Sequence, residues 1–285
     1  MHKLELYKAH DFSATAEPKI TVVFIHGIAS NSLAYAHALE YLEGDKKLNA
    51  RYIAFDLLGS GESLKSDQLE YTYDEQLEAL KQSLKKAKIN TPIILVGHSM
   101  GTFISARFVS KNPGVIKRLI LVSPPVYTVE DLKNPAFKAA IKVFEDAVSV
   151  KDPTVVNEKS FQNSMKNIVM DSKNYEVLTK IDIPTDMIIG LQDQFIASYN
   201  LPKLKKINPN LTVIPTPGHH GVSHEKYHEI GKSFAHWLWP LSGSLALSGT
   251  HYSAQCFGVG TLNRYRALHP NPLPGSRSKD VPIPR

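Results

Sequence analysis

The chain has 285 residues, 42% of them hydrophobic, which is enough for one large α/β domain or two small domains with a sizeable core. Residues 240–285 supply four of the six net positive charges, so the remainder gives little reason to expect a nucleic-acid partner. The single cysteine, Cys256, cannot form an internal disulfide. Residues 1–10 lack the apolar core of a signal peptide, and no later run is long enough to cross a bilayer. We therefore expect a cytoplasmic location without stable membrane insertion.

Strand and helix patterns alternate along the first part of the chain. Residues 4–7 suggest a short opening strand, and the apolar run at 19–25 predicts a strongly buried one. Apolar residues at helical spacing follow at 31–42, with Asn31 or Ser30 available as the helix cap. The next expected elements are a strand at 52–55, a helix at 73–88, a strand at 93–96, a helix at 100–110 and a strand at 118–122. This alternation predicts an α/β fold with a doubly wound, mostly parallel sheet.

The pattern changes in residues 126–184, which look helical and contain no convincing buried strand. Asn134 and Pro135 are typical of a helix start. One apolar stripe follows them, made of Phe137, Ile141, Phe144 and Val148. We interpret this segment as a small helical cap on the sheet. A membrane-surface helix is the alternative, but its polar face mixes Glu145 and Asp146 with two lysines, which weakens the case for anionic lipid.

The sheet pattern resumes after the cap. The expected elements are a strand at 186–189, a helix at 201–207, a strand at 211–214 and a last helix at 223–238. Residues beyond 239 are rich in proline, serine and glycine and do not support a packed element. The predicted organisation is a first part of the core at 1–125, the cap at 126–184, a second part of the core at 185–239, and a flexible or artificially added tail at 240–285.

One stretch, Gly-His-Ser-Met-Gly at residues 97–101, combines the features of a sharp strand-to-helix turn. A strand precedes it and a helix follows, so Ser99 would be raised above the edge of the sheet. Gly97 and Gly101 have a steric role, because a side chain at either position would collide with the neighbouring strand or helix. The unpartnered N–H groups of the first helical turn favour developing negative charge. Ser99 is therefore the candidate nucleophile.

A serine hydroxyl needs a base to remove its proton, and the base needs a third group to hold its tautomer. In a parallel sheet these groups come from loops at the carboxyl ends of the strands. Such loops carry Asp193 and the histidine pair His219 and His220. The chain order Ser, Asp, His is the one expected when the serine lies on a turn of this kind.

With these motifs, the sequence from about residue 20 to 239 resembles an α/β-hydrolase of the serine esterase and lipase type. The motifs that carry the resemblance are His26-Gly27 after a strand, the turn at 56–63, the elbow at 97–101, the segment 190–193 and Gly218-His219. The resemblance implies oxyanion donors from the backbone N–H groups of Ile28 and Met100. The glycine before His219 matches the family pattern, which favours His219 as base. His220 stays open, because the loop conformation decides which imidazole faces Ser99. In the fullest family pattern, two strands precede the His-Gly strand. This sequence shows one short strand there, so the number of strands stays open.

Three other polar residues near these motifs have structural interpretations. We expect His26 to brace the oxyanion loop by a side-chain hydrogen bond, with direct catalysis as the weaker alternative. His98 should point away from the serine hydroxyl because the turn is tight. Asp56 resembles the family's structural aspartate, which holds the following glycine turn, and is only a distant second to Asp193 as the acid.

The segment 224–228 matches the zinc-binding pattern His-Glu-x-x-His. The third ligand position of the longer zinc-protease signature is occupied by Phe234, and His236 comes two residues late, so no complete ligand set is visible. In a hydrolase this helix would pack apolar side chains against the core. We therefore expect no metal and no cofactor, and a zinc peptidase is kept as an alternative that chelation would test.

Together these patterns predict a serine hydrolase of the carboxylesterase kind that cleaves small-molecule esters with small or medium acyl chains through an acyl-enzyme. Serine at the elbow, in place of aspartate, argues against epoxide-hydrolase and haloalkane-dehalogenase activity. A short cap suggests a modest pocket, which favours esters over long-chain lipids. Lipase, carbon–carbon bond hydrolase and acyltransferase activities on the same triad stay open. An alternative of another class is a ligand-sensing receptor with slow turnover.

Overall fold

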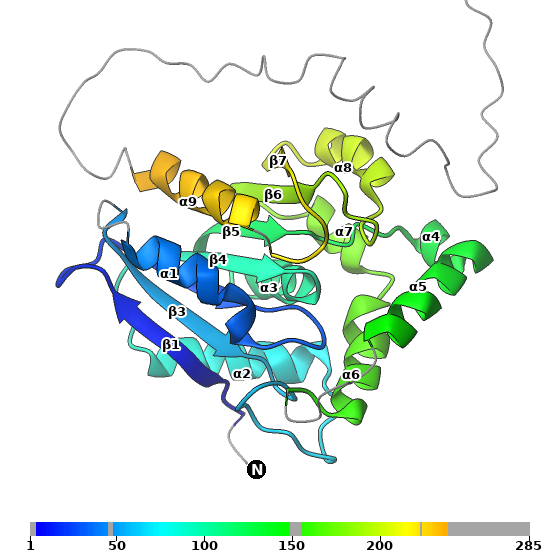
Figure 1. Ribbon diagram of the computed structural model, residues 1–285, viewed down its shortest axis with the longest axis horizontal. Coiled ribbons are helices and arrows are strands. Elements are labelled where there is room, and N and C mark those ends of the chain that lie inside the picture. The colour runs from blue at the N-terminus through cyan, green and yellow to red at the C-terminus, as the bar shows by residue number, and fades with distance from the viewer. Residues whose placement is uncertain (1–3, 45–47, 149–154, 223, 239–285) are drawn as a thin grey trace, which may run out of the picture.

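The computed structural model describes residues 4–44, 48–148, 155–222 and 224–238. At its centre lies a seven-stranded sheet with the strand order β1-β3-β2-β4-β5-β6-β7 (Figure 1). The strands are β1 Tyr7–Ser13, β2 Ile20–Ile25, β3 Ala50–Asp56, β4 Ile93–His98, β5 Ile116–Val122, β6 Thr185–Gly190 and β7 Leu211–Thr216. β1 is antiparallel to β3, and all other neighbouring strands are parallel. The predicted α/β fold with a mostly parallel sheet is confirmed.

Helices cover both faces of this sheet (Figure 1). The helices outside the cap segment are η1 Ser32–Tyr35, α1 Ala36–Gly44, α2 Tyr73–Lys86, α3 Met100–Lys111, η4 Ser198–Asn200, α8 Leu201–Ile207 and α9 His224–Leu238. α1 and α9 pack on one face, while α2 and α3 pack on the other. Their bounds agree with the predicted helices within a few residues, except that 31–42 is divided into η1 and α1. Asn31 is the cap, since its side chain accepts a hydrogen bond from Leu33 N–H at 3.0 Å.

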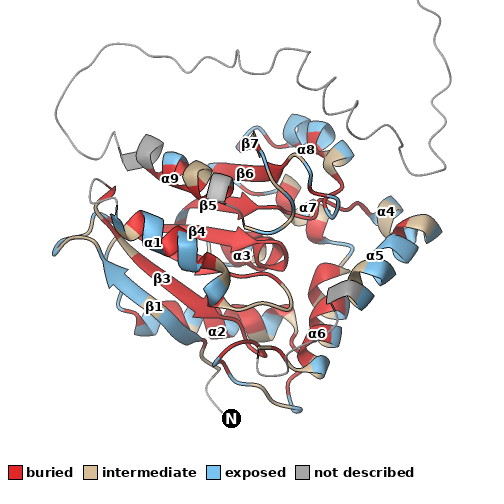
Figure 2. Ribbon diagram, viewed as in Figure 1, coloured by how far each residue is buried: buried red, intermediate tan, exposed pale blue. Residues whose placement is uncertain are grey.

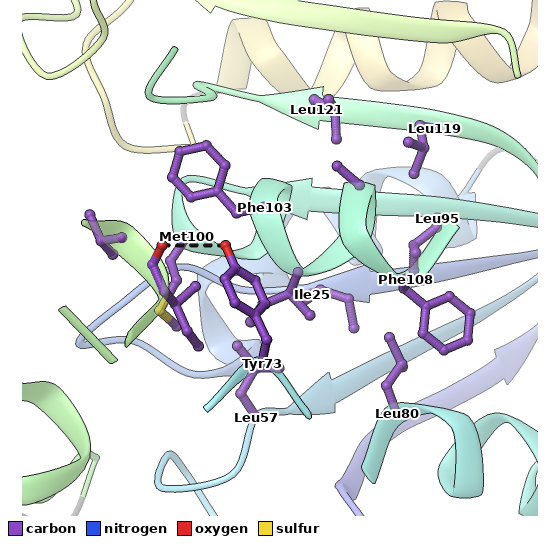
Figure 3. Close-up of a cluster of buried hydrophobic side chains, with 14 of the residues drawn as sticks. Ile25, Leu57, Tyr73, Leu80, Leu95, Met100, Phe103, Phe108, Leu119 and Leu121 are labelled. Carbon is purple, nitrogen blue, oxygen red and sulfur yellow. Dashed lines mark hydrogen bonds between the residues drawn. The ribbon is translucent and has the colours of Figure 1, made fainter. Parts of the chain in front are cut away.

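Two hydrophobic cores follow from the alternation of side chains along buried strands. In β2, Val23 and Ile25 join the core beneath α2 and α3, whereas Val22 and Phe24 join the core beneath α1 and α9. The central strands are buried throughout (Figure 2). Figure 3 shows the first of these cores, in which Phe103 of α3 lies among side chains from neighbouring strands. A strand buried on both faces explains why its sequence is continuously apolar.

The predicted bounds of the opening strand are wrong. β1 begins at Tyr7, where the predicted strand ends, and most of its side chains are exposed. Leu6 is buried instead by packing against the core, and its N–H donates to Ser83 Oγ of α2 at 2.8 Å. The apolar residues Leu4 and Leu6 therefore mark where the chain packs against the core. The strand itself is a polar edge strand whose hydrogen bonds to β3 are independent of hydrophobic alternation.

The described residues between β5 and β6 contain five helices and no strand of the sheet. They are α4 Val129–Lys133, α5 Pro135–Val148, α6 Glu158–Ser164, the π-helix η3 Met165–Val169 and α7 Asn174–Thr179. Asn134 Oδ1 accepts a hydrogen bond from Ala136 N–H at 2.9 Å, as expected for the start of α5. On the predicted stripe, Phe137 and Ile141 are buried and Phe144 is half-buried; the side chain of Val148 lies outside the described residues.

The cap segment is fixed to the core through α2 and α3. Tyr73 of α2 donates from its hydroxyl to Asn174 Oδ1 at 2.5 Å, and the Arg107 guanidinium of α3 lies 3.9 Å from the centre of the Tyr73 ring. Arg107 also pairs with Asp171 at 2.9 Å. None of the described helices combines the length and apolar character of a bilayer span. The predicted tail at 240–285, with Cys256, lies outside the described residues.

Candidate active site

Ser99 occupies the turn between β4 and α3 in a backbone conformation that is unusual for a residue with a side chain. Its φ is 51° and its ψ is −118°. Its N–H donates to the carbonyl of Val122 on the neighbouring strand at 3.0 Å, which fixes the turn against β5. Such strain persists only where the surroundings impose it, and it is concentrated at functional sites. The predicted strand-turn-helix context of Ser99 is confirmed.

The two glycines that flank the turn are required by close backbone contacts. A Cβ atom on Gly97 would lie 2.5 Å from the carbonyl oxygen of Gly101. A Cβ atom on Gly101 would lie 2.4 Å from the carbonyl oxygen of Ile25 in β2. Both distances are far below van der Waals contact, so the expected collisions with the helix and the strand are confirmed.

The loop after β7 brings His220, and not His219, to the serine. His220 Nε2 lies 2.8 Å from Ser99 Oγ, and His220 Nδ1 lies 3.0 Å from both carboxylate oxygens of Asp193. The His220 side chain is only 14% exposed. His219 is exposed, and its Nδ1 lies 3.2 Å from the carbonyl oxygen of Gln192. The sequence-based choice of His219 is therefore corrected in favour of the alternative, His220.

The torsions of the loop explain this correction. Gly218 has a φ of 115°, a conformation that favours glycine, and it lies directly before the two histidines. Its N–H donates to Gln192 Oε1 at 2.6 Å, and Gln192 N–H donates back to the Gly218 carbonyl at 3.1 Å. With Gly218 held in this way, the next side chain points outward to solvent and the one after it points inward. Tertiary contacts hold the loop in this conformation, among them those with Gln192 and the hydrogen bond between His98 Nε2 and the His220 carbonyl.

Asp193 is the acid that the structure brings to the imidazole, as its place after β6 suggested. It is 3% exposed, and its Oδ1 also accepts a hydrogen bond from Phe195 N–H at 3.0 Å. Burial raises the pKa of Asp193, but the hydrogen bond and the charge of His220 outweigh this and lower it overall. The carboxylate is thus ionised at neutral pH and can hold the Nδ1–H tautomer of His220.

The loop that carries Ile28 lies against the elbow. A Cβ atom on Gly27 would be 3.1 Å from Ser99 Cβ, so the backbone after β2 passes directly beside the nucleophile. Met100 is the first residue of α3 and adjoins Ser99 in the chain. These positions agree with the expected sites of the two N–H donors, whose role in binding an oxyanion stays a prediction.

His26 and Asp56 support this loop through main-chain contacts. His26 is fully buried, and its Nε2 accepts a hydrogen bond from Leu57 N–H at 2.9 Å while Nδ1 donates to the Gly27 carbonyl at 2.7 Å. Burial lowers the pKa of His26, so the ring is neutral. Asp56 accepts from the N–H groups of Ser32 at 2.8 Å and Glu62 at 3.0 Å. Both residues thus have the structural contacts that the sequence suggested.

His98 contacts the main chain of His220. Its Nε2 lies 2.8 Å from the carbonyl oxygen of His220, and this oxygen can only accept. Burial is the main reason that the pKa of His98 is lowered to about 3. The neutral ring therefore carries its proton on Nε2 and is directed to the His220 carbonyl and not to Ser99 Oγ, as expected.

Two residues near His220 were not identified from the sequence. The Phe195 ring packs edge-on against the His220 ring at 5.3 Å and also contacts Phe144 of α5 at 4.8 Å, which links the cap segment to the base. Lys226 of α9 is completely buried behind the His220 loop. Its spacing from Ile230 and Phe234 places it on the apolar stripe of the helix, and a lysine on such a stripe is a signal that could have found it.

The zinc-like segment of α9 is only partly described. Its first two side chains, and that of His236, lie outside the described residues. The His228 ring packs against the Tyr41 ring of α1 at 4.7 Å, and Phe234 is buried in the core. The packing expected for Phe234 is confirmed, and the absence of a metal stays a prediction.

Comparison with known proteins agrees with the fold. A family model described as alpha/beta hydrolase fold matches residues 20–156, which include the elbow. The esterase EaEST from Exiguobacterium antarcticum superposes with a TM-score of 0.63 over 82% of this chain and 95% of its own, at 18% identity. This chain has the α/β hydrolase fold.

The proteins similar in sequence to this chain include lysophospholipases and lipases. It is 40% identical over 117 residues to the probable lysophospholipase BODYGUARD 2 of Arabidopsis thaliana, a match that covers 40% of this chain but only 25% of that protein. Lipase 1 of Psychrobacter immobilis is 28% identical over 239 residues, which cover 72% of this chain and 71% of that protein. The Arabidopsis match thus spans about a quarter of its relative. These similarities support a hydrolase.

Proposed function

We propose that this α/β hydrolase cleaves carboxylic esters of small or medium acyl chains, with Ser99 as nucleophile, His220 as base and Asp193 as the acid that orients it. The continuous contact from Ser99 Oγ through both nitrogens of His220 to Asp193 carries the proposal. A serine becomes a nucleophile when a neutral imidazole accepts its proton, and this arrangement provides one.

In the first half of the reaction, Ser99 Oγ attacks the ester carbonyl while its proton passes to His220 Nε2. The carbonyl oxygen gains negative charge, and the N–H groups of Ile28 and Met100 stabilise it. The tetrahedral intermediate then breaks its bond to the alcohol, which leaves with the proton from His220. The acyl group stays on Ser99 as an ester.

In the second half, water takes the place of the alcohol. His220 removes a proton from the water, the resulting hydroxide attacks the acyl carbonyl, and Ser99 leaves with the proton returned by His220. Asp193 stays ionised throughout and stabilises the imidazolium that forms in each half. These reaction steps require no cofactor.

The aromatic surroundings of the base support an apolar acyl or alcohol group. Phe195 is 39% exposed, and its ring covers His220 on the side of the cap segment. Tyr127 donates from its hydroxyl to the Phe195 carbonyl at 2.7 Å, which holds this aromatic residue in place. Similarity to Lipase 1 over most of the chain favours a second candidate, a lipase acting on longer acyl chains.

A panel of p-nitrophenyl esters from acetate to palmitate tests the proposal and separates the two candidates. Short esters should give the highest kcat/KM, whereas a maximum at palmitate would favour the lipase. Ser99→Ala should lower kcat by about 10⁴-fold or more and abolish labelling by a fluorophosphonate. Ser110→Ala, at an exposed position of the same helix α3, is the matched control and should behave as the wild type. Ester turnover that survives in Ser99→Ala would refute the proposal.

A further inference from the structure

Lys226 is a buried lysine with several oxygen contacts and no part in the mechanism above. It is the third residue of α9, and its side chain is fully buried. Its Nζ donates to Ser123 Oγ at 2.6 Å and to the carbonyl oxygens of His219 and, at 3.4 Å, His220. All of the oxygens that it contacts lie on the loops after β5 and β7.

Two of these oxygens belong to the loop that carries the base. The carbonyl of His220 accepts from Lys226 on one side and from His98 Nε2, at 2.8 Å, on the other. The loop also presses on Gly190 at the end of β6, where a Cβ atom would lie 2.6 Å from the Gly218 carbonyl oxygen and 3.1 Å from Lys226 Nζ. The ammonium thus occupies a small space between β6 and the loop, in direct contact with both.

Packing alone does not explain a lysine at this position. Removing an ammonium from water costs several kcal/mol, and an apolar side chain would continue the stripe of Ile230 and Phe234 without that cost. The carbonyl oxygens compensate the buried positive charge, and they would lose a hydrogen-bond donor if Lys226 were replaced by an apolar residue. Ser123, which supplies the third oxygen, has a φ of 51°, a strained conformation of the kind held at functional sites.

We infer that Lys226 is a positioning residue for the base: its buried ammonium holds the carbonyls of His219 and His220 and thereby places the His220 imidazole between Ser99 and Asp193. The inference rests on the proposed triad function and adds to it a residue that acts only through the loop. The hydrogen bonds of Lys226 go to Ser123, His219 and His220 and not to Ser99.

The charge of Lys226 is sensitive to mildly alkaline pH. Burial lowers the pKa of Lys226 to about 8, against the opposing effect of the Asp193 carboxylate. The other titratable groups around it are His219 and His220 after β7, His98 at the end of β4 and Asp193 after β6. The loop after β5 contributes the hydroxyl of Ser123, and α1 meets α9 further along the helix, at Gly231 and His228. Because the folded-state pKa lies below that of a free lysine, the ammonium is present below about pH 8 and is lost as the pH rises through that value.

The test compares Lys226→Met and Lys226→Gln with Lys232→Met, a matched control at an exposed position of the same helix. With a p-nitrophenyl ester at pH 7, Lys226→Met should lower kcat by about 10- to 100-fold with little change in KM, since a misplaced base affects the chemical step. Lys226→Gln keeps N–H donors without the charge and should retain more activity. Wild-type kcat/KM should fall above about pH 8, and both Lys226 variants should lack this fall. Lys232→Met should match the wild type throughout.

A second readout does not need turnover. The proton between His220 Nδ1 and Asp193 should give a far-downfield NMR resonance in the wild type, which weakens in Lys226→Met and, in the wild type, on raising the pH through about 8. A wild type with this resonance but without ester hydrolysis would refute the proposed function and leave the positioning role supported. Lys226→Met with wild-type kcat and pH profile would overturn the inference. If that variant does not fold, a wild type and a Lys226→Gln variant with identical alkaline profiles would overturn it equally.

Discussion

His220 Nδ1 lies 3.0 Å from both carboxylate oxygens of Asp193, and this contact decides which nitrogen of the imidazole carries the proton. Because a carboxylate can only accept, Nδ1 must donate, and in the neutral form of the ring the lone pair is then on Nε2, which faces Ser99 Oγ. The buried carboxylate has an overall lowered pKa, so it stays an acceptor at neutral pH. The acid therefore sets the tautomer on which the proposed chemistry depends.

Asp193→Asn should leave the fold intact and remove most of the activity. The amide can donate to Nδ1, which favours the tautomer with its proton on Nε2 and so blocks proton transfer from Ser99. We expect kcat to fall by about 10³- to 10⁴-fold. Steady-state kinetics on a p-nitrophenyl ester measure this, with Asp182→Asn, an exposed position before β6, as the control. A loss smaller than about tenfold would contradict the assigned role.

The two adjacent histidines should differ sharply on substitution. His220→Ala removes the only imidazole in hydrogen-bond contact with Ser99 among the described residues, and kcat should fall by about 10⁴-fold or more. His219→Ala removes an exposed ring and should change kcat by less than about threefold. Initial rates of the two variants under identical conditions decide between them. The reverse order of activities would restore the family-based choice of His219.

The outcome at this histidine pair shows where prediction from sequence ends. Ser99 and Asp193 could be placed because each follows a buried strand, and parallel strands bring their carboxyl ends to one edge of the sheet. The base could not be placed to the residue, because the conformation of the loop after β7 decides which of the two histidines points inward. Contacts with residues far away in the chain hold that loop, among them the hydrogen bond from Gly218 N–H to Gln192 Oε1, 26 residues earlier.

The bounds of the opening strand and the contacts of Lys226 could not be predicted for a different reason. Hydrophobic periodicity reports burial, and burial is not the same as secondary structure or function. Leu6 is buried outside any strand, whereas the edge strand β1 is largely exposed. Lys226 is a polar residue on an apolar stripe, and the stripe alone does not reveal which oxygens meet it.

The glycine at the start of α3 should be intolerant of any side chain. In Gly101→Ala, the new Cβ would lie 2.4 Å from the carbonyl oxygen of Ile25, a rigid backbone atom of a buried strand. The backbone must shift, and we expect a loss of about 3 kcal/mol in the free energy of unfolding. Gly44→Ala is the matched control, since nothing lies within 4 Å of its Cβ at the end of α1, and it should be neutral or slightly stabilising. Urea denaturation of both variants measures the difference, and equal stabilities would contradict the steric interpretation.

The edge strand should contribute a pH-dependent increment of stability through Asp11. Hydrogen bonds from Arg51, at 2.7 and 2.8 Å, lower the pKa of Asp11 to about 2. Because the folded pKa is below the unfolded one, the increment is complete above about pH 4 and disappears as the pH falls towards 2. Solvent screening at this surface pair limits it to about 1 kcal/mol or less. Urea unfolding of the wild type and Asp11→Asn between about pH 2 and 7 should show the difference. It should shrink in an Arg51→Met background, in which Lys8 still pairs with Asp11.

The buried pair between Arg118 of β5 and Asp186 of β6, with Nη2 and Oδ2 2.5 Å apart, has a consequence for how this protein can change. These two strands are neighbours in the sheet, and the chain leaves the first and returns through the second to build the cap segment at 126–184. The pair locks the register of the two attachment points whatever the residues between them are. The pair therefore joins the two strands at which the cap segment begins and ends, and we expect the pairing of β5 with β6 to persist when residues between them are exchanged.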